Sequence, residues 1–303
     1  MKHVYLAVIL AACGGGASGT TLFDGPTSGN VAVADGTVYF TTYGNAGNHL
    51  LAVPLAGGEA VEVSPDPAPA AAFPGNLMIV DDRAWWSATG TVIAADLDTG
   101  EREIVAELPP ASSLGANLAV DDQFVYAAGI DLLKIPRAGG AITTLLEGNS
   151  ATSITVADGE LLFIEGGLVV ALDIETATRR ELDTGSPFLF SVVYDAATDT
   201  ALAINERELF RFELATGQPL ETLSLETGEA YIGMLVDRGQ IYGWRSVEHQ
   251  PLCDLVRIST TTGDVEQLAT GGCGQLALDG NTLVAAGVET SAKDGAIVRF
   301  DLD

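Results

Sequence analysis

A short unit recurs seven times along this chain of 303 residues, and this repeat limits the possible folds more than any other feature. Each unit holds an apolar run that ends near an aspartate, a tight turn, a second apolar run, a gap, and a third apolar run that ends at a turn. The aspartates of the first turn are Asp35, Asp81, Asp121, Asp158, Asp195, Asp237 and Asp279. Their successive spacings are 46, 40, 37, 37, 42 and 42 residues. Repeats of about 40–50 residues with four strands each are typical of the blades of a β-propeller.

The three apolar runs predict strands A, B and C of each blade, counted from the central axis outward. In the first unit they read NVAVAD at 30–35, TVYFTTY at 37–43 and HLLAVPL at 49–55. The runs of strands B and C are nearly continuous, as expected where neighbouring blades bury both faces of a sheet. Glycine and aspartate at the turns supply the positive φ angles that tight hairpins need.

The two ends of the chain predict how the ring closes. The seventh unit stops at its strand C, VRFDLD at 298–303, and lacks a strand D. Near the other end, TLFDG at 21–25 matches TLLEG at 144–148, the strand D that ends the third unit. We therefore predict an all-β fold, one seven-bladed β-propeller over residues 20–303, in which an N-terminal strand completes the last blade and removes an exposed sheet edge.

Several of these runs resemble a known group of repeats. The segments VYFTTYG, AWWSATG, VPLAGG and IPRAGG are similar to bacterial relatives of the YWTD-like and NHL-like propeller repeats. The resemblance covers residues 20–303 and implies the propeller fold, which hosts many unrelated activities. The YWTD domains of receptors have six blades, whereas seven units are counted here.

The first 19 residues read as a targeting segment. Residues 1–12, MKHVYLAVILAA, combine Lys2 with an apolar stretch that is too short to span a bilayer as a helix. The following LAAC at 10–13 resembles the lipobox of bacterial lipoproteins, which implies cleavage before Cys13 and lipid on its sulfur. Residues 13–19 would then be a flexible tether, and Gly14 suggests sorting to the outer membrane of the cell envelope. The alternative is an ordinary secretory signal with a chance cysteine.

The charge of the chain excludes some classes of partner. Lys and Arg number 14 and Asp and Glu 41, for a net charge of −27, and no basic cluster occurs. Nucleic acid binding needs such a cluster to neutralise phosphates, and so does direct binding to anionic lipid headgroups. We expect no nucleic acid partner, and membrane contact only through the lipid on Cys13. Cations, cationic peptides, neutral glycans and other proteins remain as partners of an expected monomer.

Two cysteines are predicted to form a disulfide bond. Strands alternate in direction, so the D-to-A and B-to-C loops share one end of the ring, here named the upper mouth. Cys253 and Cys273 both map to this mouth and lie 20 residues apart. In an oxidising compartment two such cysteines favour a disulfide. The alternatives are buried free thiols or a thiol nucleophile.

Ligand-binding candidates are the polar residues that map to the upper mouth. They are the two B-to-C residues His49 and His249 and the asparagines that begin three A strands, Asn30, Asn76 and Asn117. Solvated loop positions are the plainer interpretation of the histidines. No catalytic residue is assigned, because no G-x-S-x-G segment occurs and the two histidines beyond the targeting segment cannot supply a three-histidine zinc site.

No cofactor is expected, although calcium is possible. The carboxylate pairs Asp96/Asp98 and Asp195/Asp199 could hold Ca²⁺, but aspartate in turns more often bonds its own backbone. Both pairs map to the lower mouth, opposite the histidines. Trp86 and Trp244 lie at similar offsets beyond their aspartate turns, which favours packing between blades over a role in ligand stacking.

Two functions remain open at this point. The first is a membrane-anchored envelope lipoprotein whose propeller is a non-enzymatic binding or scaffolding domain for protein or other ligands. The second is a metal-dependent hydrolase or lyase, similar to lactonases, with its site in the central channel. Carboxylates or asparagines that converge at the upper ends of several A strands would favour the second.

Overall fold

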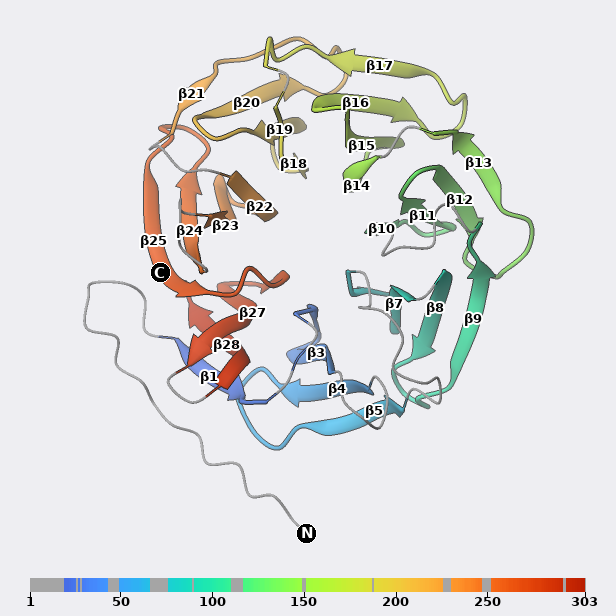
Figure 1. The fold of residues 1–303 in the computed structure, drawn as a ribbon, viewed down its shortest axis with the longest axis vertical. Helices are drawn as coiled ribbons and strands as arrows, with labels where there is room; N and C mark the ends of the chain where they lie inside the picture. Colours follow the sequence, from blue (N-terminus) through green and yellow to red (C-terminus); the bar gives the residue numbers. More distant parts are fainter. Residues whose placement is uncertain are drawn as a thin grey trace.

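The repeated units fold into antiparallel sheets arranged in a ring around a central axis (Figure 1). The computed structural model describes residues 19–25, 27, 29–42, 49–65, 76–88, 90–109, 117–148, 151–186, 188–225, 230–246, 252–290 and 293–302. Cys13, the targeting segment and His249 lie outside these ranges. No helix long and apolar enough to cross a bilayer occurs in the described ranges.

Blades 1 to 4 are four-stranded sheets whose strands follow one another in the chain. Blade 1 contains β2 (Val31–Ala34), β3 (Thr37–Thr42), β4 (His49–Pro54) and β5 (Val61–Pro65). Blade 2 contains β6 (Met78–Val80), β7 (Arg83–Ala88), β8 (Thr91–Asp96) and β9 (Arg102–Glu107). Blade 3 contains β10 (Asn117–Val120), β11 (Phe124–Ala128), β12 (Leu132–Pro136) and β13 (Thr143–Leu146). Blade 4 contains β14 (Thr152–Ala157), β15 (Glu160–Glu165), β16 (Leu168–Asp173) and β17 (Arg179–Leu182).

The remaining strands form blades 5 to 7. Blade 5 contains β18 (Ser191–Asp195), β19 (Thr200–Ile204), β20 (Glu208–Glu213) and the short β21 (Leu223–Ser224). Blade 6 contains β22 (Ala230–Asp237), β23 (Gln240–Ser246), β24 (Cys253–Ser259) and β25 (Val265–Gly271). Blade 7 contains β26 (Leu276–Asp279), β27 (Thr282–Thr290), β28 (Lys293–Asp301) and, from the other end of the chain, β1 (Thr20–Phe23).

Strand β1 closes the ring as the sequence predicts. It pairs antiparallel with β28, with Thr20 opposite Arg299 and Thr21 opposite Val298. Leu22 is buried and packs in the apolar cluster between blades 7 and 1. Figure 1 shows the N-terminal strand lying against the last sheet. The predicted seven-bladed propeller with an N-terminal closing strand is therefore confirmed.

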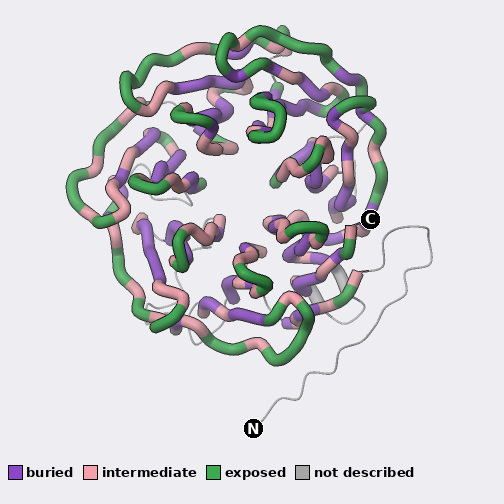
Figure 2. The backbone as a smooth tube through the Cα atoms, turned by 180° about the vertical axis from the view of Figure 1, so that it is seen from behind, coloured by how far each residue is buried: buried purple, intermediate pink, exposed green. Residues whose placement is uncertain are grey.

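The core is divided among the seams between blades. Seven apolar clusters are found, and each joins residues of two adjacent blades. At the seam of blades 7 and 1, for example, Phe40 and Val53 meet Val284 and Ile297, all fully buried. Buried segments accordingly fill the middle of each sheet, while exposed segments concentrate at the outer strands and turns (Figure 2). Burial on both faces explains the continuous apolar runs of strands B and C.

One hydrogen bond recurs in all seven blades and fixes the lower ends of the sheets. The residue just after strand C donates its backbone N–H to a carbonyl of the turn between strands A and B. The donors are Leu55, Leu97, Arg137, Ile174, Leu214, Thr260 and Leu302, with N···O distances of 2.7 to 3.2 Å. This bond shows that the seven units are equivalent in structure, even though their sequences differ.

Blades 6 and 7 depart from the pattern of separate sheets. A single bridge pairs Gly271, at the end of β25, with Val288 of β27, so the two blades form one continuous eight-stranded sheet. The strands approach closely because Gly271 has no side chain, since a Cβ there would lie 2.8 Å from the Cα of Val288. The bulge in β27 between Ala286 and Val288 includes Gly287, whose φ of 76° suits glycine.

The tryptophans pack inside the protein, as expected, but their predicted equivalence is wrong. Trp85 and Trp244 are fully inaccessible, and Trp86 is 5% exposed. The strand registers place Trp86 opposite Ile93, and Trp244 opposite Leu255. Ile93 lies four residues before Leu97, the residue that follows strand C, whereas Leu255 lies five residues before the equivalent Thr260. The two tryptophans therefore differ in position by one residue. Counting from the aspartates gave a false equivalence because the turn between strands A and B differs in length between blades.

Candidate functional site

The upper mouth of the ring is bordered by the residues that lead into the inner strands. Asn76, just before β6, is one of the predicted ligand-binding residues, and its side chain reaches the neighbouring blade. Its Oδ1 accepts from the backbone N–H of Leu118 at 2.6 Å, and its Nδ2 donates to the carbonyl of Leu118 at 2.8 Å. This pair of bonds mimics a piece of β-ladder between blades 2 and 3. Asn76 is thereby engaged in holding the ring together.

Ser153 makes a similar connection between blades 4 and 5. Its Oγ accepts from the backbone N–H of Val192 at 2.9 Å and lies 3.1 Å from the Oγ of Ser191. Ser153 has a φ of 48°, which is uncommon for a residue with a side chain. It sits in a bulge of β14 between Thr152 and Thr155. The bulge places the hydroxyl beside the neighbouring inner strand.

Gln275 makes the third connection, and it spans a whole blade. It lies just before β26 in blade 7, yet its side chain binds the backbone of Leu77 in blade 2. The Oε1 accepts from the N–H of Leu77 at 2.9 Å, and the Nε2 donates to its carbonyl at 2.7 Å. The backbone N–H of Gln275 donates to Gly29 of blade 1 at 2.6 Å. The three connections through Asn76, Ser153 and Gln275 are called the interblade amide and hydroxyl bonds below.

The other two asparagines differ from Asn76 in their surroundings. Asn30 is 9% exposed and precedes β2, whereas Asn117 is exposed at the first position of β10, opposite Ala128. Both lie on inner strands or directly before them, as the sequence predicts. Asn117 is the asparagine of the three that solvent reaches most freely.

His49 lies away from the channel. It is the first residue of β4, the third strand from the axis, and its Nδ1 is 2.6 Å from the Oε1 of Glu62 in the same blade. Because β3 separates it from the inner strand, His49 does not join the asparagines at the channel. His249 lies outside the described residues.

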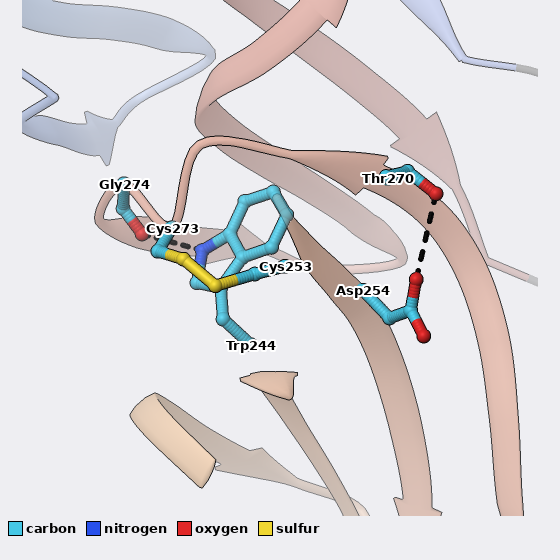
Figure 3. The surroundings of a disulfide bond; sticks show 6 residues. All are labelled: Trp244, Cys253, Asp254, Thr270, Cys273 and Gly274. Carbon is cyan, nitrogen blue, oxygen red and sulfur yellow. Dashed lines mark hydrogen bonds between the residues drawn. A yellow bond between two sulfur atoms is a disulfide. The ribbon is translucent and has the colours of Figure 1, made fainter. Parts of the chain in front are cut away.

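The predicted pairing of Cys253 with Cys273 is present in the structure (Figure 3). The bond joins the start of β24 to the loop that enters blade 7, with Cα atoms 5.6 Å apart. Trp244 lies beside it, and its Nε1 donates to the carbonyl of Gly274 at 2.5 Å. The disulfide therefore braces the seam at which the two sheets are joined.

A buried ion pair lies next to the disulfide, in blade 6. Arg245 Nη2 donates to Asp254 Oδ2 at 2.9 Å, and both side chains are at most 15% exposed. The other oxygen of Asp254 accepts from Gln267 at 2.8 Å and from Thr270 at 3.5 Å, the latter drawn in Figure 3. Burial is the largest single influence on the pKa of Arg245 and lowers it, but the bond and charge of Asp254 together with the contacts to Tyr231 raise the pKa overall. Both oxygens of Asp254 are thus bonded, whereas Arg245 Nε is buried without a hydrogen bond to any described residue.

The carboxylates considered for calcium serve as turn formers. Asp96 Oδ1 accepts from the backbone N–H of Thr99 at 2.8 Å, from its hydroxyl at 2.9 Å and from the N–H of Asp98 at 3.1 Å. Asp195 accepts from Ala197 and Thr198, two and three residues on. Within the described residues no three His, Cys, Asp or Glu side chains are grouped so that they could hold a metal ion.

Three large apolar side chains are exposed at the upper mouth of the ring. Phe188, in the loop from β17 to β18, is 72% exposed, and Ile130, between β11 and β12, is 47% exposed. Ile232, near the upper end of the inner strand β22, is 37% exposed. These three, called the upper apolar residues below, were not singled out from the sequence. A phenylalanine that follows a proline in a D-to-A loop is the only signal that the sequence offers, and it is weak.

Comparisons with known proteins agree on the fold. No family model matches the chain, and no curated protein matches it. Among solved structures, an oligogalacturonate lyase in complex with manganese superposes with a TM-score of 0.73 at 12% identity, over 95% of this chain and 93% of that one. The WD40 repeats of RRP9 give 0.71 at 11% identity, over 93% and 97% of the two chains. A chain of a nidogen/laminin complex gives 0.57 at 13% identity, over 78% and 93%.

These identities are too low to carry more than the fold, because propellers with unrelated functions share one architecture. The neighbours' own names illustrate this, since they include a lyase, a WD40-repeat protein and a nidogen/laminin complex. Together with the strand order, they identify the chain as a β-propeller of seven blades closed by its N-terminal strand.

Proposed function

We propose that this protein is a non-enzymatic binding propeller, held to the outer membrane of the cell envelope by lipid on Cys13, and that it binds a basic protein partner at the upper mouth. The observation that carries the proposal is the contrast between bonded polar side chains and exposed apolar side chains at that mouth. The side chains of Asn76, Ser153 and Gln275 there are bonded to neighbouring blades, and large apolar side chains remain exposed.

The polar residues matter because a catalytic centre needs polar groups directed at the substrate. Asn76, Ser153 and Gln275 instead direct their polar atoms at the backbone of other blades. The alternative of a metal-dependent hydrolase or lyase in the channel would need a group of oxygen or nitrogen ligands there. The interblade amide and hydroxyl bonds therefore favour binding over catalysis.

The upper apolar residues supply contacts for a protein partner. Exposed aromatic side chains are enriched among the residues that contribute most to protein–protein affinity. Phe188 is 72% exposed, and exposing so large an apolar side chain is unfavourable unless something covers it. The net charge of −27 adds a long-range attraction for a basic partner, which accelerates association. The exposed aromatic side chain and the negative net charge both favour a protein ligand.

Photo-crosslinking from Phe188 tests the binding surface. A photoreactive phenylalanine analogue at position 188 of the full-length chain, in the cells that produce it, should crosslink one defined protein. The matched control places the same analogue at Ile104, which is 59% exposed but lies on the outer strand β9. Equal yields at the two positions, or none at 188, would contradict the proposed surface. With the purified partner, Kd should rise steeply with salt, because screening weakens the attraction.

Fractionation tests the anchor separately. The wild-type chain should sediment with outer membranes and carry the mass of a lipid-modified cysteine at its N-terminus. Cys13→Ser should abolish the modification and leave the protein out of the membrane fraction. A wild-type chain of unmodified mass would overturn the anchor without bearing on the binding surface.

A further inference from the structure

A cavity of about 500 Å³ opens on the lower face of the ring between blades 6 and 7. It lies at the ends of the strands opposite to the upper mouth. Blade 6 contributes the turn from β22 to β23 and parts of β23, β24 and β25, and blade 7 contributes the turn from β26 to β27 and Leu302. Its polar lining includes Arg238, Gln240, Arg257 and Asn281. This volume lies in the range of pockets that hold small ligands.

The equivalent place at three other seams is crossed by a direct bond. At three seams a cation of one blade donates to the carbonyl of the residue after strand C of the next blade. Arg299 donates to Leu55 at 2.8 Å, Lys134 to Ile174 at 3.5 Å, and Arg180 to Leu214. These bonds join neighbouring blades at their lower ends.

At the seam of blades 6 and 7 the cation turns the other way. Arg257 occupies the same position as Arg299 and Lys134, three residues before the residue that follows strand C. It donates instead to Glu266 of its own blade, from Nη2 at 2.5 Å and from Nε at 3.1 Å. The carbonyl it would reach by analogy belongs to Leu302, which lines the cavity. Open space at a seam does not depend on that pairing alone, because a cavity of about 420 Å³ also lies at the seam of blades 3 and 4, where Lys134 does donate to Ile174.

The lining presents both hydrogen-bond donors and hydrogen-bond acceptors. Gln240 and Asn281 each offer both kinds, and Asn281 already accepts from Arg238. Tyr242 lies at the buried side of the cavity, and burial raises its pKa, so its hydroxyl stays protonated at neutral pH. Such a surface suits a ligand whose own groups both donate and accept.

The charges of the lining disfavour ionic ligands. Two guanidinium groups, of Arg238 and Arg257, face three carboxylates, of Asp237, Asp264 and Glu266. An anion would meet these carboxylates within a protein of net charge −27, and a metal ion would meet the guanidinium groups. A ligand with many hydroxyl groups and no charge avoids both costs.

We propose that this cavity binds a neutral sugar unit, and that it is a second site independent of the upper mouth. The planar amide and guanidinium groups of Gln240, Asn281 and Arg238 bond adjacent hydroxyls of the sugar. The carboxylates accept from hydroxyls further along its ring.

Binding to defined saccharides tests the proposal. The full-length lipoprotein, purified in a detergent without sugar headgroups, is examined by saturation-transfer NMR with maltose, cellobiose, lactose and chitobiose. Galacturonic acid, inorganic phosphate and spermidine serve as acidic, anionic and cationic probes. At least one neutral disaccharide should bind with Kd below about 1 mM, more tightly than any charged probe.

Two variants connect the binding to the cavity. Gln240→Ala and Asn281→Ala should each raise Kd at least tenfold for that sugar. Gln218→Ala, an exposed glutamine in blade 5, should change it less than twofold. Thermal unfolding of each variant shows whether the fold is retained, and the Gln240 variant decides if Asn281→Ala does not fold. Absence of binding by all four disaccharides, preference for a charged probe, or equal Kd for Gln240→Ala and Gln218→Ala would each overturn the proposal.

Discussion

At the scale of single residues, the aspartates of the turns after strand C have an unusual electrostatic environment. Asp96 and Asp173 accept equivalent bonds, each from the backbone and hydroxyl of the threonine three residues on. The bond from the threonine backbone is the largest cause of a lowered pKa in both residues, and the threonine hydroxyl is the next. The charged form is therefore the one the fold favours, so the stabilising contribution is present above the ordinary aspartate pKa of about 4 and is lost as pH falls through the lower folded value.

We predict that both carboxyl groups titrate below the ordinary value in an NMR titration of the folded protein. Thr99→Val removes the hydroxyl donor and keeps the backbone donor, so the pKa of Asp96 should move part of the way upward. Asp173 should not move in this variant, which makes it an internal control. An unchanged pKa of Asp96 would mean that the hydroxyl bond contributes nothing to the lowering.

At the scale of structural elements, the bond from Asn76 to Leu118 shows how the inner strands keep their register. Asn76→Ala would leave the N–H and carbonyl of Leu118 without their partner between β6 and β10. We predict a loss of about 1–3 kcal/mol in the free energy of unfolding, the usual range for unsatisfied buried polar groups. Asn117→Ala is the matched control, because Asn117 is exposed and should change stability by less than about 0.5 kcal/mol. Denaturant unfolding measures both variants, and similar losses would contradict the difference.

The elements were largely predictable from the sequence because burial on both faces leaves a continuous apolar run. The predicted runs at 30–35, 37–43 and 49–55 became β2, β3 and β4 with boundaries shifted by at most one residue. The joining of Gly271 to Val288 was not predictable, because a hydrophobic pattern identifies strands and not the lateral approach of two sheets. Asn76 was found as a polar residue at the mouth, but an amide that bonds a ligand and one that bonds a backbone look identical in sequence. The direction in which Arg257 turns, toward Glu266 of its own blade, could not be read from the sequence either.

At the scale of the whole molecule, stability depends on the closing strand β1. Leu22 is 8% exposed and packs with residues of blades 7 and 1. We predict that Leu22→Ala lowers the free energy of unfolding by about 2–4 kcal/mol, as is typical for a buried leucine. Loosening of β1 should also uncover the edge of β28 and promote self-association, which light scattering detects. Thr20→Ala, at an exposed position of the same strand, is the control and should change neither property. Equal stability of the two variants would show that β1 is not needed to close the ring.

The pairing of β1 with β28 also determines when the last blade can form during synthesis of the protein. The partners Thr20 and Arg299 stand at opposite ends of the chain, 279 residues apart. A ribosome that adds about 5–20 residues per second needs roughly 15–55 s to travel that distance. Throughout that interval β1 has no partner strand, and any blades already formed make an open arc whose two end blades expose apolar faces. The seventh blade is therefore the last to be completed whatever the order of the other six, and the nascent chain needs protection from premature partners until its final residues appear.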